Sequence, residues 1–245
     1  MNPIIIHLEE TTSTNTHLQQ WIMKEEVPEG SVVTAKVQTQ GRGQAGNKWN
    51  AEQGKNLTFS MVLYPEFVAA NEQFIISQIV ALAVKETLSL YIPDVTIKWP
   101  NDIYYLNKKI TGILIENNLT EKTFSSSIIG IGINVNQTEF PSDLPNPISL
   151  IQIISKEISI DEVLEQILSR VYSYYSLIRE DKESVRTHYF NSLYRHEGLF
   201  AFYDHLRKEE IKASILSVEK NGILNLKMDN GEIRSYWFKE VQYLL

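Results

Sequence analysis

Cysteine is absent from this chain of 245 residues. Its absence excludes disulfides, thiolate nucleophiles and zinc sites built on thiolates. The five histidines, at positions 7, 17, 188, 196 and 205, are scattered without the spacing of a metal-binding motif. No G-x-S-x-G sequence occurs, and no covalent enzyme intermediate is indicated. The remaining candidate chemistry depends on cations, glycines and carboxylates.

Positive charge is also scarce: 23 lysines and arginines face 30 acidic residues, for a net charge of -7. A nucleic-acid partner is not expected, because such proteins usually carry a basic surplus. No apolar run approaches the length of a membrane helix, and the N-terminus lacks the basic start of a signal peptide. We therefore expect a cytoplasmic protein without a membrane partner.

The apolar residues follow helical and strand periodicities along most of the chain. Strands are expected at residues 31–38, 57–64, 95–99, 102–105, 109–116 and 124–135. Helices are expected from about Asn15, over residues 73–90, from a capping box at residues 159–162, and over residues 183–194. Residues 140–147 hold three of the eight prolines and are expected to form a loop.

The C-terminal part of the chain has a different pattern. From about Gly198 short strands are separated by turn signals, Asn221-Gly222 and Asn230-Gly231. About fifty such residues predict a small barrel-like β module. We therefore expect two domains, residues 1–195 and residues 196–245.

Residues 38–49, hereafter the glycine loop, contain a G-x-G-x-x-G sequence from Gly41 to Gly46. A dinucleotide site would require a helix directly after the motif, whereas the pattern here predicts a strand. A P-loop would require lysine directly after Gly46, where the chain has Asn47. A protein kinase would require H-R-D and D-F-G motifs, which are absent. The literal motif therefore does not identify any of these nucleotide-binding folds.

Cations and an aromatic residue gather around the same loop. Arg42, Lys48 and Lys55 outnumber the one acid there, Glu52. Trp49 is unusual in a purely solvated loop, and glycine N–H groups are free to face an anion. These features favour a loop that closes over a phosphate, with an indole available to stack on a base. A flexible surface loop is the alternative.

Lys98-Trp99-Pro100-Asn101-Asp102 lies between two predicted strands. Pro100 favours a turn that presents Asn101 and Asp102 beside Lys98. These three polar side chains are candidate site residues. A purely structural turn is the alternative interpretation.

Glycines interrupt two apolar strands further along. In the first, strand alternation predicts Lys109, Thr111 and Ile113 on one face, and Gly112 indicates close approach of a ligand or another backbone. In the second, residues 129–134, two glycines indicate a bulge or a ligand. A solvated lysine is the alternative for Lys109. Lysines, an arginine and a carboxylate suit attack on phosphorus, where positioning and charge neutralisation dominate.

Five blocks together have the order seen in one enzyme family. They are Ser13-Thr14-Asn15, the glycine loop, Lys98-Trp99-Pro100-Asn101-Asp102, residues 109–112 and Gly130-x-Gly132-x-Asn134. The chain resembles biotin protein ligases from about residue 4 to its end, and it looks like the short monofunctional class without a DNA-binding domain. The resemblance implies an α/β (α+β) fold, a mixed sheet with packed helices of the class II synthetase and biotin–lipoate ligase kind, and a C-terminal SH3-like barrel.

The resemblance also implies a two-step reaction. Biotin and ATP give biotinyl-5'-AMP and pyrophosphate with Mg²⁺, and a lysine of a biotin carboxyl carrier protein then takes the biotinyl group. A lipoate-protein ligase, which shares the fold, is the nearest rival, and a binding module without turnover is the other. Whether the chain forms a homodimer stays open.

By this resemblance Arg42 and Lys109 neutralise the carboxylate and the α-phosphate, and Asp102 binds magnesium or orients the incoming lysine. Trp49 stacks on adenine and Asn134 binds its edge. Biotin contacts are implied for Ser13, Thr14, Asn15, Gln38, Arg42, Gly43, Gln44, Lys109 and Gly112. ATP or adenylate contacts are implied for Gly41, Arg42, Gly43, Gln44, Lys48, Trp49, Lys98, Asn101, Lys109, Gly130, Gly132 and Asn134.

One departure concerns charge in the loop. The family often has a second arginine where this chain has Gln44, and another basic residue near Asn47. The missing charge predicts weaker retention of the adenylate, or compensation by Lys48.

Overall fold

A seven-stranded mixed sheet forms the centre of the computed structural model, which describes residues 2–119 and 124–244. The strand order is β1-β2-β3-β7-β6-β5-β4. Only β1 and β2 pair in parallel within this sheet; the other described pairs are antiparallel. The strands are β1 Ile5–Thr11, β2 Val32–Gln38, β3 Leu57–Leu63, β4 Val95–Lys98, β5 Asp102–Tyr105, β6 Lys108–Leu119 and β7 Phe124–Ile133.

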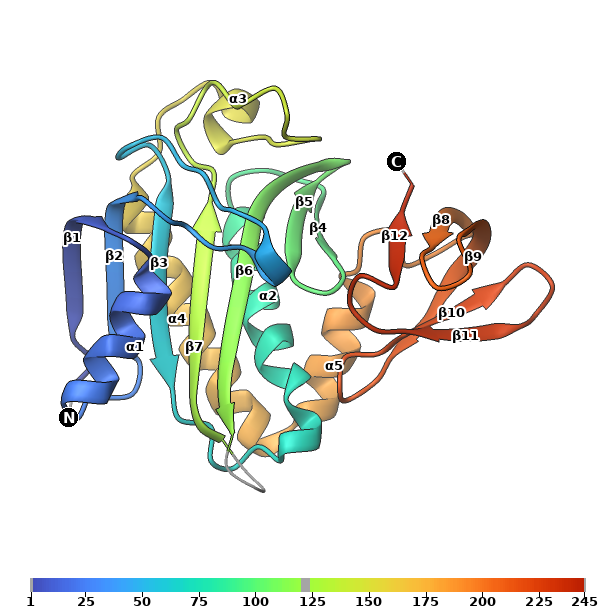
Figure 1. Ribbon diagram of the computed structural model, residues 1–245, viewed down its shortest axis with the longest axis horizontal. Helices are drawn as coiled ribbons and strands as arrows, with labels where there is room; N and C mark the ends of the chain where they lie inside the picture. The colour runs from blue at the N-terminus through green and yellow to red at the C-terminus, as the bar shows by residue number, and fades with distance from the viewer. Residues whose placement is uncertain (1, 120–123, 245) are drawn as a thin grey trace.

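Helices cover both faces of this sheet (Figure 1). Helices α2 Phe74–Leu88, α4 Ile160–Glu180 and α5 Lys182–Asn191 pack on one side, and α1 Thr14–Lys24 packs on the other. A short α3, Leu150–Ile154, lies at one end. The described part of the chain contains no helix with the length and apolarity to cross a membrane.

Period-two alternation in the central strands gives the sheet two different faces. Met61 and Ile129 point into the core that also contains residues of α2 and α4, whereas their neighbours Val62 and Ile128 pack under α1. Farther along the α1 face, the partners are Ser60 and Gly130, then Thr58 and Gly132. Beyond the N-terminus of α1 the apolar surface therefore gives way to small and polar residues, which leaves room above the sheet.

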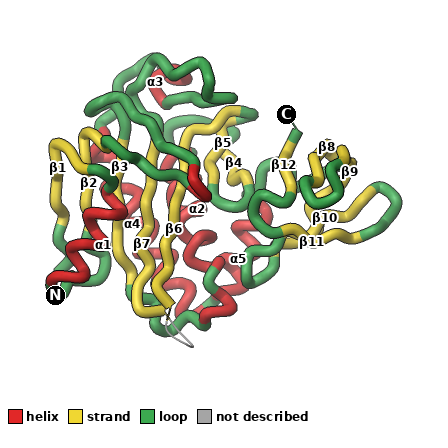
Figure 2. The backbone as a smooth tube through the Cα atoms, viewed as in Figure 1, coloured by secondary structure: helices red, strands yellow, loops and turns green. Residues whose placement is uncertain are grey.

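The C-terminal residues form a second, antiparallel sheet of five strands (Figure 2). Its order is β11-β10-β9-β8-β12, with β8 Phe200–Asp204, β9 Glu209–Val218, β10 Leu224–Met228, β11 Ile233–Tyr236 and β12 Val241–Tyr243. The two predicted Asn-Gly turns join β9 to β10 and β10 to β11. Phe202 and Tyr236 belong to the same apolar core as the large sheet, so the two sheets pack as one body.

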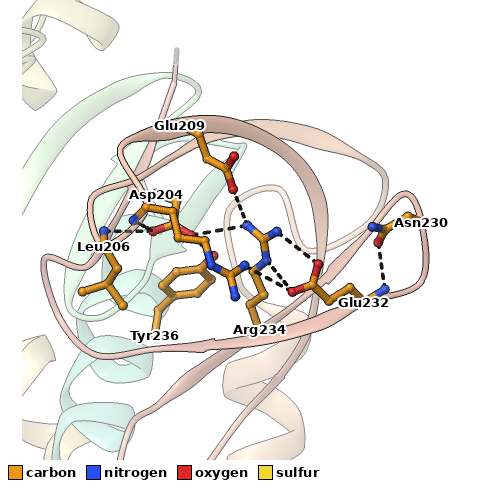
Figure 3. A network of polar contacts seen from close by, with 8 residues as sticks. Asp204, Leu206, Glu209, Asn230, Glu232, Arg234 and Tyr236 are labelled. Carbon is orange, nitrogen blue, oxygen red and sulfur yellow. Dashed lines mark hydrogen bonds and ion pairs between the residues drawn. The ribbon is translucent and has the colours of Figure 1, made fainter.

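Polar contacts tie the small sheet together from inside (Figure 3). Asp204 is 1% exposed and accepts a hydrogen bond of 2.7 Å from the Tyr236 hydroxyl. Arg234 pairs with Asp204 at 3.4 Å and with Glu209 at 2.8 Å. The buried carboxylate is thus compensated, as its burial requires.

The expected strands and helices are present, within a few residues of their predicted ends. Four described elements were missed: β1, an edge strand without a buried residue, α3, which has only five residues, and two short 3-10 helices, η1 Gln44–Gly46 in the glycine loop and η2 Ala70–Glu72. The capping box expected at Ser159 is incomplete, because Ser159 accepts from the Glu162 amide without the reciprocal bond. The full box instead starts α3, between Ser149 and Gln152.

Candidate active site

A cavity opens on the α1 face of the large sheet, where the connection from β2 to β3 crosses in front of β7 and β6 (Figure 2). Most of the predicted site residues line it. They are Ser13, Thr14, Asn15, Gln38, Arg42, Gly43, Gln44, Lys48, Trp49, Asp102, Lys109, Gly112, Gly130 and Gly132. Segments far apart in the sequence therefore meet here, on the α1 face of the sheet and in the connection that crosses it.

One wall of the cavity is a chain of hydrogen bonds. The Thr14 amide and hydroxyl donate to Gln38 Oε1 at 2.8 and 3.1 Å. Ser60 Oγ lies 2.7 Å from Thr14 Oγ1 and donates to Asn15 Oδ1 at 2.5 Å. Asn15 Nδ2 in turn donates to Glu116 Oε2 at 2.8 Å. This wall offers fixed polar atoms to a ligand with its own donors and acceptors.

Two members of this wall were not predicted. Ser60 is fully buried in the middle of the apolar strand β3, and Glu116 lies in the second half of β6. The sequence did contain one sign of a role for Ser60 in the cavity wall, because it is a polar residue inside an otherwise apolar strand. Glu116 resembled an ordinary charged residue near the end of a strand, so nothing in the local sequence marked it.

Two of the three predicted cations in the cavity, Arg42 and Lys109, are paired with carboxylates. Arg42 forms a bidentate pair with Glu116, with N···O distances of 2.9 and 2.8 Å. Lys109 Nζ lies 2.7 Å from Asp102 Oδ1. All four side chains are between about a quarter and two fifths exposed. These cations are therefore held in place and remain within reach of an entering anion.

Lys109 does not share a face with Thr111 and Ile113, as simple alternation predicted. The pairing of β5 with β6 shifts register between Ile103 and Tyr104, and Ile110 is left without a partner. This bulge turns Lys109 to the cavity side, where its Cε would lie 3.5 Å from a Cβ built at Gly112. Thr111 and Ile113 are buried, and Ile113 also borders the cavity.

The glycines on the cavity floor are covered by side chains of the chain itself. A Cβ at Gly132 would lie 2.3 Å from Trp49 Cε2, and one at Gly112 would lie 3.0 Å from Trp49 Cζ3. A Cβ at Gly130 would lie 2.2 Å from Asn15 Oδ1. The pairing of β7 is regular through both of its glycines, so of the two predicted alternatives, a bulge or a ligand, the bulge does not apply. Glycine is required here because other residues occupy the space of its missing side chain.

Backbone hydrogen bonds close the glycine loop on itself. The Gly43 N–H donates to Asn47 O at 2.7 Å, and the Trp49 N–H donates to Gly41 O at 3.0 Å. The Gly43 N–H is therefore engaged, whereas we expected free N–H groups facing an anion. Gly41 lies outside the cavity lining, and a Cβ there would lie 2.3 Å from Trp49 O. The loop thus has its own folded geometry.

Lys98 lies away from the cavity wall. Its Nζ donates to the Tyr104 hydroxyl at 2.9 Å and lies 4.7 and 5.4 Å from the ring centres of Tyr104 and Tyr243. Burial lowers the pKa of Lys98, and the same cause raises the pKa of Tyr104. Lys98 therefore joins the large sheet to the C-terminal module.

Asn101 and Asn134 also lie outside the cavity lining, and both are buried. The Asn101 side chain donates to a backbone carbonyl of β6. The Asn134 side chain donates to the carbonyl of Ile148 at 3.1 Å. Both amides hold neighbouring segments of backbone in position.

A family model gives the deciding comparison: the biotin/lipoate A/B protein ligase family matches residues 8–134. The chain belongs to this family. It is 37% identical over 147 residues to the bifunctional ligase/repressor BirA of Bacillus subtilis, covering 58% of this chain and 44% of that protein. It is 27% identical over 245 residues to the biotin–protein ligase of Homo sapiens, and this match covers 94% of this chain and 33% of the human protein. The chain thus spans less than half the length of these relatives.

Solved structures of biotin protein ligases have the same fold. The Aquifex aeolicus enzyme in complex with biotin and ATP superposes with a TM-score of 0.80 at 27% identity, covering 98% of this chain and 99% of that one. The Leishmania major enzyme with biotinyl-5-AMP has a TM-score of 0.68 at 22% identity, and the match covers 97% of this chain and 100% of the Leishmania chain. The predicted α/β fold with a mixed sheet and packed helices is confirmed.

Asp102 is the carboxylate that we expected to bind magnesium. Among residues 2–119 and 124–244, no group of three or more histidine and acidic side chains is arranged to hold a metal. Mg²⁺ commonly uses one or two carboxylates together with substrate phosphates. Asp102 fits that use, provided that Lys109, 2.7 Å away, moves toward the phosphates.

Proposed function

We propose that this chain activates biotin with ATP to biotinyl-5'-AMP and transfers the biotinyl group to a lysine of a biotin carboxyl carrier protein. One observation carries the proposal: Arg42 and Lys109 face the same cavity, beside a polar wall and above a floor of glycines. The names of the relatives and the ligands of the Aquifex structure support the same assignment.

The cavity suits a ligand that is polar at both ends. The wall of Thr14, Asn15 and Gln38 is the expected partner of the ureido ring of biotin, whose N–H and C=O groups need fixed acceptors and donors. The carboxylate end would then lie toward Arg42 and Lys109. Ser13, Gly43, Gln44 and Gly112 complete the proposed biotin contacts.

In the first step a biotin carboxylate oxygen attacks the α-phosphorus, and the bond to pyrophosphate breaks. Two anions must approach each other, so the main task of the protein is to position them and to balance their charge. Arg42 and Lys109 are placed for this task at the cavity edge. Asp102 would hold Mg²⁺ bound with ATP, and the ion would supply further positive charge at the phosphates.

In the second step the amine of the carrier lysine attacks the acyl carbon, AMP leaves and a proton is released. Asp102 is the carboxylate that we expect to orient that lysine. Trp49 covers Gly112 and Gly132 on the cavity floor, and we infer that it moves from them to stack on adenine when ATP binds. Lys98, Asn101 and Asn134 stay predictions for the ATP site.

We propose that the chain acts in the cytoplasm, where ATP is available. Neither nucleic acid nor a membrane has a role in the proposed reaction. The proposal assigns catalysis to residues 1–195 and leaves residues 196–245 as an SH3-like module. A homodimer is not required, because the cavity is formed within one chain.

Pyrophosphate release in the presence of ATP tests the proposal directly. We expect release with biotin and much less with lipoate. Release with lipoate alone would assign the chain to lipoate ligation, and binding of biotin without any release would make it a binding module. Lys36→Ala serves as a control, because Lys36 pairs with Glu9 on the surface and should leave the rate unchanged.

A further inference from the structure

Glu116 joins three separate parts of the cavity. It lies on β6 and accepts two hydrogen bonds from Arg42 of the glycine loop, at 2.9 and 2.8 Å. It also accepts one from Asn15 of α1, at 2.8 Å. Both carboxylate oxygens are therefore used, and one residue of the sheet holds the loop and the helix at once.

The bidentate pair fixes the plane of the Arg42 guanidinium. A long arginine side chain has many rotamers, and two parallel N–H···O bonds select one orientation. The pair uses two of the five guanidinium N–H groups. The remaining N–H groups are available to an anion in the cavity, so Arg42 can bind Glu116 and a ligand at the same time.

The same pair attaches the middle of the loop to the sheet. At its start the chain is held by bonds from Thr39 and Gln40 to the end of β1, and farther on Gly54 donates to Lys36. Between these points the loop backbone is bonded to itself, and two of its side chains reach the sheet: Arg42 bonds to Glu116 on β6, and Trp49 packs over Gly112 and Gly132. The Glu52 N–H also donates to Gln137 Oε1 at 3.1 Å. Loss of the pair would therefore leave the loop fold and the Trp49 contact in place and release the Arg42 side of the loop from the sheet.

We propose that Glu116 is a positioning residue for Arg42: it seats the glycine loop and presents the guanidinium to the carboxylate of the substrate. The inference rests on the proposed biotin-activating function, because the substrate anion is taken from it. It also concerns the docking of the loop, which can be measured on the protein alone without any ligand.

Limited trypsin digestion without ligand measures that docking, because Arg42 and Lys48 are cleavage sites within the loop. Glu116→Gln removes the charge, and Glu116→Asp keeps it on a side chain one methylene shorter. Glu9→Gln is the matched control, since it breaks the exposed pair between Glu9 of β1 and Lys36 of β2. We expect faster loop cleavage in both Glu116 variants and a wild-type rate in the control.

The kinetic measurement is the KM for biotin in pyrophosphate release. We expect KM to rise about fivefold in Glu116→Gln and Glu116→Asp, a factor set by the usual strength of a partly exposed ion pair, while kcat changes less. The double variant Arg42→Ala/Glu116→Gln should cost no more than Arg42→Ala alone, because the two residues act as one unit.

Three results would overturn the inference: wild-type loop cleavage in both Glu116 variants, a wild-type KM in Glu116→Asp, or additive effects in the double variant. A wild-type chain that releases no pyrophosphate would instead overturn the proposed function. The trypsin comparison would still decide whether Glu116 docks the loop, so the two failures are distinguishable.

Discussion

The indole of Trp49 lies against Gly132 so closely that a Cβ at this glycine would come within 2.3 Å of Trp49 Cε2. The indole Nε1 is buried and has no hydrogen-bond partner among the described residues. A buried N–H without an acceptor costs free energy. The resting position of Trp49 is therefore held by packing alone, which suits a side chain that must give way to a ligand.

Gly132→Ala should displace Trp49 from the floor of the cavity. The new methyl group would overlap the indole, whereas Gly112→Ala meets it at 3.0 Å and demands a smaller shift. We expect acrylamide to quench tryptophan fluorescence more strongly in Gly132→Ala than in Gly112→Ala, and adenylation to fall in the same order. Equal quenching in the wild type and both variants would contradict the observed contact.

Lys109→Ala should depress adenylation while leaving the fold intact. Lys109 is partly exposed and pairs with Asp102, so little packing is lost. Removing a cation aimed at developing charge typically costs about 10²–10³ in rate. Single-turnover pyrophosphate formation measures the loss, and the melting temperature serves as the fold control. A near-normal rate would remove Lys109 from the reacting centre.

Gln44 occupies a position where the family often has arginine, and Lys48 is the nearby cation that lines the same cavity. If Lys48 compensates, Lys48→Ala should release biotinyl-AMP faster than the wild type, and Gln44→Arg should slow release in both backgrounds. Filtration of enzyme loaded with radiolabelled adenylate gives the release rates. An unchanged rate in Lys48→Ala would exclude compensation by this residue.

Glu72, just before α2, links α5 to the C-terminal module and should make stability depend on acid. Hydrogen bonding from Lys182, then from Arg186, lowers the pKa of Glu72 from 4.5 to about 2 against the opposing effect of burial. Lys220, in the turn between β9 and β10, lies 3.6 Å away. Because the folded-state pKa is lowered, the stabilisation is present above pH 4.5 and is lost as pH falls toward 2.

The measurement is the melting temperature of the wild type and Glu72→Gln between pH 6 and 2. The wild type should be the more stable above pH 4.5, and the difference should shrink toward pH 2. A constant difference across this range would contradict the assigned pKa.

Much of the fold was predictable because strong local patterns carried it. The glycine loop, Lys109 and Asp102 were found from sequence blocks and do line one cavity. Glu116 and Ser60 were not, because their roles arise from contacts with α1 and the loop across large sequence separations. The orientation of Lys109 depended on a bulge at Ile110, and strand periodicity does not predict where register shifts.

The central claim is transfer of biotin to a carrier lysine, and intact mass of a purified biotin carboxyl carrier protein tests it most directly. After incubation with the chain, ATP and biotin, we predict one added biotinyl group on the carrier. We predict none on a carrier whose target lysine is arginine, and none without ATP. A known biotin protein ligase that modifies the same carrier preparation serves as the positive control. A carrier left unmodified by this chain under those conditions would contradict the proposed transfer.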